Sequence, residues 1–207
     1  MSAPKFDQEF WEQLWSKTLR EHADKVAGRP PHAQLIAEAS KLTPGRALDA
    51  GCGHGADTLW LAAHGWQVTA VDFSAAVLAH ARAMADGAGA EIAARIDWQQ
   101  GDLATWPVEA ERYDLVVCLY VHVAGSVPDM VRRMASGVAR GGTLFMVGHR
   151  PIDPSSGAAT AAAGQVQVSV EEATAALGVD EWVLVAEERP RVVNGSGVDA
   201  VIVARRR

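Results

Sequence analysis

The sequence has few cysteines and no excess of positive charge. Its 207 residues include two cysteines, Cys52 and Cys118, and carry a formal net charge of −6. Two cysteines cannot form a disulfide framework and are too few to hold a metal ion on their own, so no metal site is expected. A general nucleic-acid-binding protein usually carries a basic patch and a high isoelectric point. The acidic balance therefore argues against nucleic acid as a partner.

Long apolar runs are also missing. No stretch approaches the roughly 18–20 apolar residues that a membrane-spanning helix needs, and no apolar segment follows the charged start as it would in a secretory signal. We find no internal repeat. Apolar residues still make up 49% of the chain and charged residues 21%, which is typical of a chain that builds a core. These features predict a cytoplasmic protein without a membrane partner and leave its oligomeric state open.

Short apolar runs and amphipathic segments alternate along the chain. Nearly continuous apolar runs between helices are typical of a parallel sheet covered by helices on both faces. The last two runs flank Asn194-Gly195, a turn signal that predicts a hairpin. The predicted fold class is therefore α/β, a Rossmann-like, doubly wound, mostly parallel seven-stranded sheet ending in an antiparallel hairpin. Expected strands cover 46–49, 67–71, 96–99, 115–119, 143–147, 182–186 and 198–204, and expected helices cover 7–24, 32–41, 58–64, 74–84, 128–140 and 170–177.

The most informative segment is the glycine-rich turn after the first expected strand, Asp49-Ala50-Gly51-Cys52-Gly53-His54-Gly55. A strand, a glycine turn and a helix start place bare backbone N–H groups beside a ligand. Asp49 stands where a dinucleotide would bring its diphosphate, and a carboxylate there repels that group. It suits instead a ligand with an ammonium or sulfonium charge, and S-adenosylmethionine carries both.

Two further acids end the next two expected strands. Asp72 stands where an acid binds the two ribose hydroxyls of a nucleotide, and Phe73 beside it offers an apolar face to adenine. Asp102 follows the third expected strand and is placed to accept a hydrogen bond from the adenine amino group. Each acid alone is compatible with a turn or cap residue, so the prediction rests on the three together.

These motifs resemble the class I S-adenosylmethionine-dependent methyltransferases from Gly45 to about Val147. The resemblance implies S-adenosyl-L-methionine as cofactor, S-adenosyl-L-homocysteine as product, and in-line methyl transfer to an O, N or S atom of a small molecule. The opening aromatics are similar to the small-molecule branch that includes tellurite-resistance and thiopurine methyltransferase-like proteins. The cofactor-binding residues expected from the motifs and the resemblance are Asp49, Gly51, Cys52, Gly53, Gly55, Asp72, Phe73, Asp102, Leu103, Leu119 and Tyr120.

A single methyltransferase domain over 1–207 is expected to have four parts. Residues 1–42 form an N-terminal helical cap, 43–149 the cofactor-binding core, and 169–207 a C-terminal helix and hairpin. Residues 150–168 are rich in Pro, Ser, Gly and Ala and have no clear period. A loop of that length in a compact domain is usually disordered or functional, so we expect a flexible loop able to close over the site.

The methyl acceptor is expected beyond the carboxyl ends of the fourth and fifth strands, where open α/β sheets form their ligand crevice. His122 is a candidate general base, since imidazole titrates near neutral pH. His149 and Arg150 end the fifth strand, and a guanidinium can hold an anionic group of a substrate. These three are the candidate catalytic residues. The candidate substrate contacts are Trp11, Trp15 and Tyr120.

Three other functions stay open. Gly51, Gly53 and Ala56 also match a nicotinamide-dependent oxidoreductase, although Asp49 disfavours its diphosphate. A nucleic-acid methyltransferase is disfavoured by the charge and by residues 119–122, which lack the Asn/Asp-Pro-Pro-aromatic segment of amino-methylating DNA enzymes. A cofactor-binding protein without methyl transfer is the third, because aligning a nucleophile in a dry site needs no signature residue.

Overall fold

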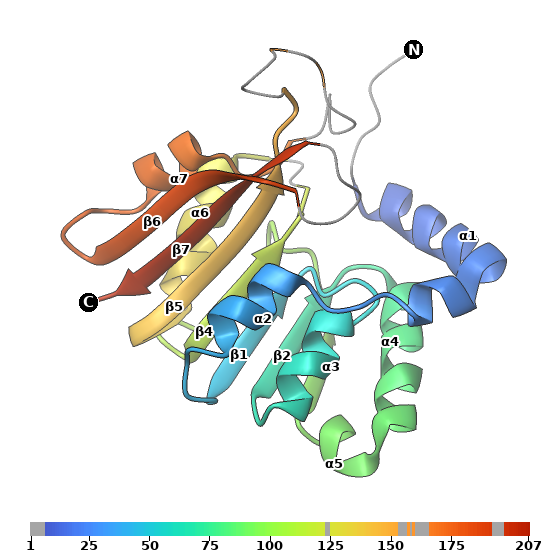
Figure 1. Cartoon of the computed structure of the whole chain (residues 1–207). Helices are drawn as coiled ribbons and strands as arrows, with labels where there is room; N and C mark the ends of the chain where they lie inside the picture. Colours follow the sequence, from blue (N-terminus) through green and yellow to red (C-terminus); the bar gives the residue numbers. More distant parts are fainter. Residues whose placement is uncertain (1–6, 123–124, 153–156, 158, 160–165, 192–196) are drawn as a thin grey trace.

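The computed structural model describes residues 7–122, 125–152, 157, 159, 166–191 and 197–207. A seven-stranded sheet runs through it in the order β3-β2-β1-β4-β5-β7-β6 (Figure 1). Strands β1 to β5 pair in parallel, and β7 runs antiparallel to both β5 and β6. This confirms the predicted fold class. The strands are β1 (Arg46–Ala50), β2 (Gln67–Asp72), β3 (Ile96–Gln100), β4 (Tyr113–Leu119), β5 (Val138–His149), β6 (Trp182–Pro190) and β7 (Val198–Arg206).

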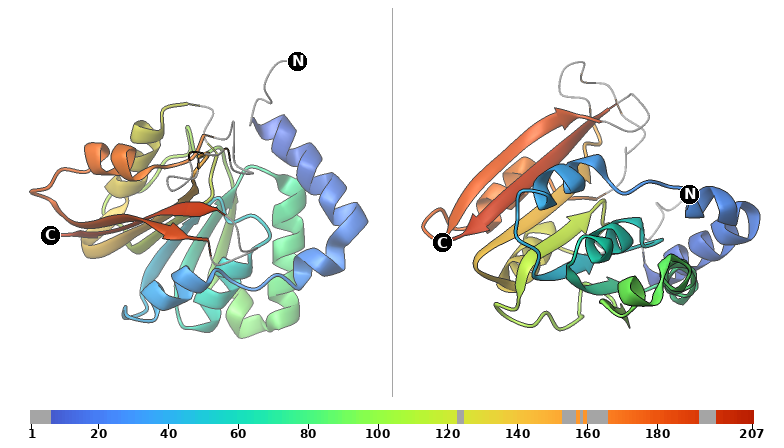
Figure 2. Two further views of the ribbon diagram at one scale, coloured as in Figure 1. Left: turned by 45° about the horizontal axis from the view of Figure 1, so that its top comes forward. Right: turned by 60° about the horizontal axis from the view of Figure 1, so that its bottom comes forward.

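Helices cover both faces of this sheet (Figures 1 and 2). Helices α6 and α7 pack on one face, and α2, α3 and α4 pack on the other. The first helix, α1, packs against α4 outside that layer. The helices are α1 (Gln8–Ala27), α2 (Ala33–Ala39), α3 (Ala56–Ala63), α4 (Ala75–Ala88), α5 (Ala90–Ala93), α6 (Val127–Ser136) and α7 (Val170–Ala176).

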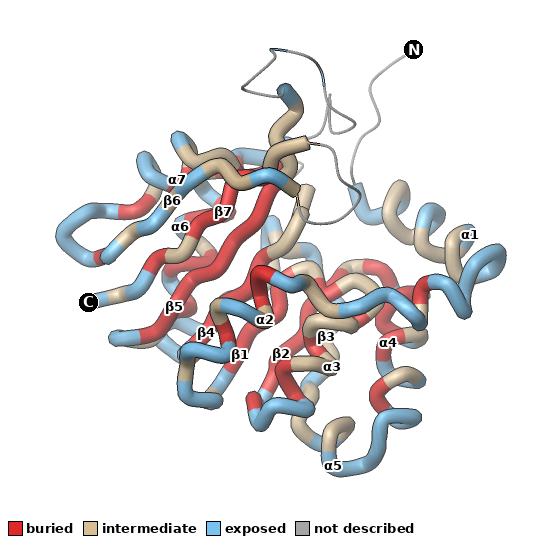
Figure 3. The backbone as a smooth tube through the Cα atoms, viewed as in Figure 1, coloured by how far each residue is buried: buried red, intermediate tan, exposed pale blue. Residues whose placement is uncertain are grey.

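Strand β5 illustrates how the sheet is buried on both sides. Leu144 and Met146 belong to the core under α6 and α7, whereas Phe145 and Val147 belong to the core under α2 and α3. All four are buried, and β5 is red along most of its length in Figure 3. A strand covered on both faces carries apolar side chains at successive positions. Polar side chains are therefore concentrated at the strand ends.

Helix α1 is far more exposed than the helices on the sheet (Figure 3). The Asp7 side chain caps it by accepting a hydrogen bond from the Phe10 amide at 3.0 Å. Val26 is the only residue of its twenty that is buried. Trp11 and Trp15, on the predicted amphipathic face, are half-buried. This face covers the carboxyl ends of the neighbouring strands instead of a core of its own.

Several element boundaries differ from the prediction, most clearly where α6 meets β5. Helix α6 ends at Ser136 and not at Arg140, and β5 begins at Val138, before the glycines expected to lead into it. The register between β4 and β5 shifts after the pair formed by Tyr113 and Val138, so an irregular strand replaces the predicted helix end. At Gly142 a Cβ would stand 3.0 Å from the Tyr113 carbonyl oxygen, a closeness that suits glycine. The short α5 has no counterpart in the prediction.

Two predicted features fall outside the described residues. The Asn194-Gly195 turn is one, and most of the 150–168 loop is the other. The described part of that loop includes an isolated antiparallel bridge between Ile152 and Ala159. Among the helices that the structure describes, none is long and apolar enough to cross a membrane.

Candidate functional site

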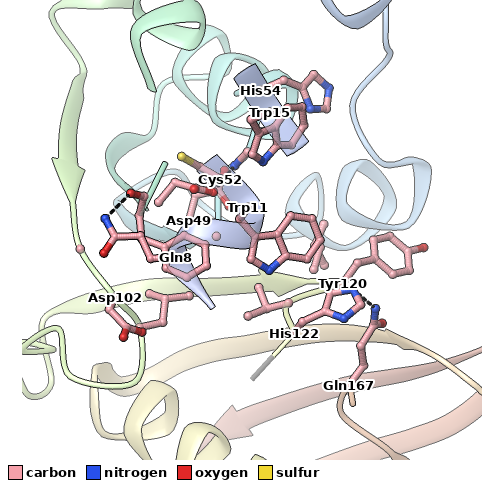
Figure 4. A pocket seen from close by; sticks show the side chains of 18 of the residues that line it. Gln8, Trp11, Trp15, Asp49, Cys52, His54, Asp102, Tyr120, His122 and Gln167 are labelled. Carbon is pink, nitrogen blue, oxygen red and sulfur yellow. Dashed lines mark hydrogen bonds between the residues drawn. The ribbon is translucent and has the colours of Figure 1, made fainter. Parts of the chain in front are cut away.

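A cavity of about 450 Å³ lies at the carboxyl ends of the central strands (Figure 4). Helix α1 contributes Gln8, Trp11 and Trp15 to its wall. This volume is typical of a small-molecule site. We call one part of the wall the acidic end, lined by Asp49, Asp57, Asp72 and Asp102, and the other the histidine end, lined by Tyr120, His122 and His149.

The glycine-rich turn lies at the acidic end and has a backbone shape that glycine adopts easily. Gly51 and Gly53 have φ angles of +81° and +51°, and a Cβ on Gly51 would stand 2.5 Å from Val121. Gly55 also has a positive φ, but it caps α3 and does not line the cavity. A Cβ there would stand 2.8 Å from Ala81 on α4. Gly55 therefore lets α3 and α4 approach, and its position gives no support to the predicted cofactor contact.

Buried Asp49 and half-buried Asp57 interact electrostatically at this end. Asp49 is 3% exposed and accepts a hydrogen bond from the Thr58 hydroxyl at 2.6 Å. Burial, and then the charge of Asp57, raises the pKa of Asp49 to about 7. Asp57 accepts a hydrogen bond from the His32 amide at 2.7 Å, and burial raises its pKa to about 6. A cation entering the cavity would favour the ionised form of both groups.

Asp72 holds the turn in place and also lines the cavity. Its side chain is buried, and its two oxygens accept hydrogen bonds at 3.0 Å from the amides of Gly53 and Ser74. Burial raises the pKa of Asp72. Each carboxylate oxygen has a second lone pair that can accept a hydrogen bond from a ligand.

The remaining residues predicted for the cofactor continue the wall of the acidic end. Phe73, Asp102 and Leu103 line the cavity, and Asp102 accepts a hydrogen bond from the Ala104 amide at 2.9 Å. The Phe73 carbonyl accepts a hydrogen bond from the Gln8 side chain at 3.1 Å. That bond ties the start of α1 to the loop after β2.

Cys52 and Trp15 lie at the glycine-rich turn. The Cys52 thiol is buried, and burial, followed by the charge of Asp49, raises its pKa well above the usual value. It therefore stays protonated and contributes wall surface rather than a nucleophile. Trp15 lies 3.4 Å from the position of a Cβ on Gly53 and packs near His54, with the ring centroids 6.2 Å apart.

Tyr120 starts the histidine end just after β4, and Leu119 before it also lines the cavity. Its φ of +56° is uncommon for a residue with a side chain. The hydroxyl donates a hydrogen bond to Asp199 at 3.0 Å and lies 2.7 Å from Nε2 of His32. Burial raises the pKa of Tyr120, so the phenol stays protonated. These bonds hold Tyr120 in its strained conformation.

His149 is paired with a carboxylate on the neighbouring strand. Residues His149 on β5 and Asp199 on β7 are cross-strand partners, and Nδ1 of the imidazole lies 2.8 Å from Oδ1 of Asp199. Arg191 donates to the same oxygen at 3.2 Å. Burial alone would raise the pKa of Asp199, but its hydrogen bonds with His149 and Tyr120 and the Arg191 charge lower it. Asp199 is therefore an ionised carboxylate.

His122 lies between an aromatic ring and an amide. Its ring centroid is 5.1 Å from that of Trp11, and its Nε2 lies 2.8 Å from Nε2 of Gln167, the contact drawn as a dashed line in Figure 4. Gln167 in turn accepts a hydrogen bond from the His149 amide at 2.6 Å. Burial lowers the pKa of His122 to about 4. His122 is therefore neutral near pH 7.

The structure does not bring Arg150 to the cavity. Its Nε lies 2.7 Å from a carboxylate oxygen of Glu188, and Glu171 lies on the other side at 3.6 Å. His149 is the last residue of β5 and lines the cavity, whereas Arg150 follows the strand and lies beside these two glutamates. The prediction that Arg150 holds an anionic group of the substrate has no support from this position.

The cavity and network residues that were not predicted include His32, Asp57, Gln167 and Asp199. Asp57 lies in the first turn of α3, where an acid also reads as an ordinary helix-start residue. Asp199 is the one acid of β7 and is followed by the apolar residues 200–204, and that isolation is a usable signal. Gln167 carries no signal, because it lies in a segment without periodicity.

The fold is the Rossmann-like fold of class I methyltransferases. Among the described residues, no group of three His, Cys, Asp or Glu side chains could hold a metal ion. Residues 47–142, a little under half of the chain, match the family described as a methyltransferase domain. The match includes the glycine-rich turn and strands β2 to β4, and ends inside β5.

Similar proteins carry methyltransferase names. The chain is 34% identical over 123 residues to ubiquinone biosynthesis O-methyltransferase of Marinobacter nauticus, covering 56% of this chain and 49% of the relative. It is 35% identical over 116 residues to ribosomal RNA small subunit methyltransferase C of Alcanivorax borkumensis, covering 53% and 34%. The chain thus spans half or less of the length of these curated relatives.

A solved structure extends the fold match beyond that segment. Magnesium protoporphyrin IX methyltransferase from Synechocystis, solved with bound S-adenosylmethionine, has a TM-score of 0.66 and 19% identity, with full coverage of both chains. At this identity the likeness concerns the fold. The narrower resemblance to the tellurite-resistance and thiopurine branch stays a prediction.

Proposed function

We propose that this chain binds S-adenosylmethionine and transfers its methyl group to a small molecule. The observation that carries the proposal is that the acidic end and the histidine end line the same cavity. One end offers carboxylates and a glycine-rich turn, and the other offers polar groups at the tips of β4 and β5. A methyl donor and a methyl acceptor have to meet in one enclosed space for an in-line displacement.

The charge at the acidic end supports a cationic ligand. Asp49 is buried and Asp57 is half-buried, and their pKa values are raised to about 7 and about 6. A diphosphate beside them would add like charge, whereas an ammonium or sulfonium group would neutralise them. The carboxylates of the acidic end therefore disfavour a nicotinamide dinucleotide and with it the oxidoreductase alternative.

The turn and Asp72 support the rest of the donor. Asp72 is positioned by two backbone amides and has lone pairs left for ribose hydroxyls. Phe73, Asp102 and Leu103 are assigned to the adenine, and Gly51 to Gly53 to the close approach of the methionine part. When bound, S-adenosylmethionine supplies a methyl group on a positively charged sulfur.

The size of the cavity supports a small acceptor. S-adenosylmethionine is itself as large as a typical drug, and a site of about 450 Å³ leaves little further room. Trp11 and His122 form the wall at the remaining space. We extend this to a cytoplasmic enzyme that works on neither nucleic acid nor membrane, with 1–207 acting as a single domain.

Transfer of label from tritiated S-adenosylmethionine tests the proposal. The purified protein is offered separate panels of small phenols, amines, carboxylic acids and thiols, and ribosomal RNA at low and high salt. The proposal expects labelled product from a small-molecule panel, lost in the Asp72→Ala variant. Label on RNA alone, with a yield that falls steeply with salt, would favour a nucleic-acid methyltransferase.

The same assay separates binding from transfer. A protein that binds S-adenosylhomocysteine yet labels no acceptor in any panel would support the third alternative, a cofactor-binding protein without methyl transfer. Binding of NADH in place of S-adenosylhomocysteine would support the oxidoreductase.

A further inference from the structure

We propose that Asp199 is a positioning residue that holds His149 with its proton on Nδ1, so that Nε2 faces the cavity as the base for an acceptor hydroxyl. This inference rests on the proposed methyl transfer and adds the acceptor class and a residue on β7. The segment matched by the methyltransferase family ends at residue 142, before both residues.

The bonding at Asp199 determines where the His149 proton lies. Asp199 is 1% exposed, and an ionised carboxylate can only accept hydrogen bonds. Its Oδ1 lies 2.8 Å from Nδ1 of His149, so that nitrogen has to be the donor. In a neutral imidazole the other nitrogen, Nε2, then carries the lone pair. The His149 side chain is 24% exposed and lines the cavity, which leaves Nε2 accessible there.

Tyr120 fixes the plane of this ring. The centroids of the Tyr120 and His149 rings are 4.1 Å apart with an angle of 32° between the planes. The phenol donates its only proton to Asp199, so it has to accept from Nε2 of His32 at 2.7 Å. The proton of Tyr120 is therefore committed to Asp199, and the phenol serves to orient the pair.

Gln167 distinguishes the two histidines of the cavity. The His149 backbone N–H can only donate, so the Gln167 atom it contacts at 2.6 Å is the amide oxygen. The amide nitrogen then donates to Nε2 of His122 at 2.8 Å, which occupies the lone pair of that ring. A proton bound at Nε2 of His122 would face the amide N–H group of Gln167, and two donors repel each other. His149, and not His122, is therefore the base.

The transfer step then balances without another reactant. The acceptor oxygen attacks the methyl carbon with an electron pair, the carbon–sulfur bond breaks, and its pair stays on sulfur. The hydroxyl proton passes to Nε2 of His149, and the charge that forms on the imidazole faces the Asp199 carboxylate across 2.8 Å. A thiol ionises by itself near neutral pH far more readily than a hydroxyl. The arrangement therefore favours a hydroxyl acceptor.

Nitrogen-15 NMR of the full chain tests the tautomers directly. The protein is labelled with ¹⁵N-histidine, saturated with S-adenosylhomocysteine, and assigned with His149→Gln and His122→Gln variants. The wild type is expected to show His149 with hydrogen on Nδ1 and a bare Nε2. A His149 ring with hydrogen on Nε2 in the wild type would overturn the proposal, whether or not any variant folds.

Turnover of Asp199→Asn gives a second readout. With a hydroxyl acceptor from the panel above, we expect turnover to fall about 100-fold, a typical loss for general-base catalysis, and Asp199→Glu to recover part of it. The affinities of Asp199→Asn and of His149→Gln for S-adenosylhomocysteine are both expected to stay within about twofold of the wild-type value. Wild-type turnover in Asp199→Asn, or a protein that methylates only thiols, would overturn the assignment.

The two proposals fail in different ways. If the wild type does not bind S-adenosylhomocysteine, the proposed function fails. If it binds that molecule and methylates an acceptor, but Asp199→Asn changes neither turnover nor the His149 tautomer, only the inference about Asp199 fails.

Discussion

The acidic end and the histidine end of the cavity shift the pKa values of their buried carboxylates in opposite directions. Asp49 has the Thr58 hydroxyl as a partner and another carboxylate nearby, and its pKa is raised to about 7. Asp199 is bonded to an imidazole, a phenol and a guanidinium, and its pKa is lowered. The acidic end therefore gains most from an incoming cation, whereas the histidine end is organised before any ligand arrives. One end is built for binding and the other for orientation.

The largest effect is expected from a substitution at the acidic end. Asp72→Ala removes the anchor of the glycine-rich turn and the proposed ribose contact. We expect affinity for S-adenosylhomocysteine to fall about 10- to 100-fold, since hydrogen bonds to a charged group contribute about 1.5–3 kcal/mol. Isothermal titration calorimetry measures this. Asp97→Ala, on the exposed side of β3, is the control and should bind like the wild type; unchanged binding in Asp72→Ala would contradict the assignment.

A smaller loss is expected from Asp49→Asn, which keeps the shape and removes the charge. Affinity for S-adenosylhomocysteine should fall about tenfold near pH 8, where Asp49 is ionised, and less near pH 5.5, where it is largely protonated. Calorimetry at the two pH values measures the difference. Equal losses at both would show that the charge of Asp49 does not contribute.

Stability should follow the same carboxylates. A folded-state pKa raised above the unfolded value stabilises the protein below the unfolded value, near pH 4, and that stability is lost as the pH rises to about 6 for Asp57 and about 7 for Asp49. A bound cation offsets the loss. The increase in melting temperature on adding S-adenosylhomocysteine should therefore be larger near pH 7.5 than near pH 5.5. A scan showing the reverse order would contradict the electrostatic account.

Replacing each tryptophan of α1 should affect only one end of the cavity, and each effect should be moderate. Trp15→Ala should weaken S-adenosylhomocysteine binding about fivefold, because the ring packs on the glycine-rich turn. Trp11→Ala should leave that affinity within about twofold and lower turnover instead, because Trp11 packs on His122. Binding and rate assays on the same preparations make the comparison. Equal losses of S-adenosylhomocysteine affinity in both variants would contradict the assignment of Trp15 to cofactor binding and of Trp11 to the acceptor side.

Arg150→Gln should have the smallest effect. Its partners are Glu188 and Glu171, and both the guanidinium and Glu188 are partly exposed, so the pair contributes about 1 kcal/mol or less. Turnover and S-adenosylhomocysteine affinity should stay within about twofold of the wild type. A large loss of turnover in a variant that keeps the wild-type melting temperature would show that Arg150 contributes to the reaction after all.

Most of the acidic end could be predicted because its information is local, and Asp57 is the exception. Asp49 and the glycines lie within seven consecutive residues, and Asp72 and Asp102 each follow a recognisable strand or strand end. Strand identity and polarity are enough to bring those groups to the same edge of a parallel sheet.

Tyr120, His122 and His149 could be predicted from their places at the ends of β4 and β5, but the partners that hold them could not. His149 and Asp199 are 50 residues apart, and they meet because β7 inserts antiparallel between β5 and β6 with these two residues in register. His122 and Gln167 are 45 residues apart and meet across segments without a periodic pattern. The sequence also does not show which of His149 and Arg150 faces the cavity, because His149 is the last residue of β5 and Arg150 follows the strand.

The most direct test of the central claim is a calorimetric titration of the wild-type chain with S-adenosylhomocysteine and, separately, with NADH. The account predicts one S-adenosylhomocysteine site per chain, weakened in Asp72→Ala, and no binding of NADH. Binding of NADH together with no response to S-adenosylhomocysteine would contradict it.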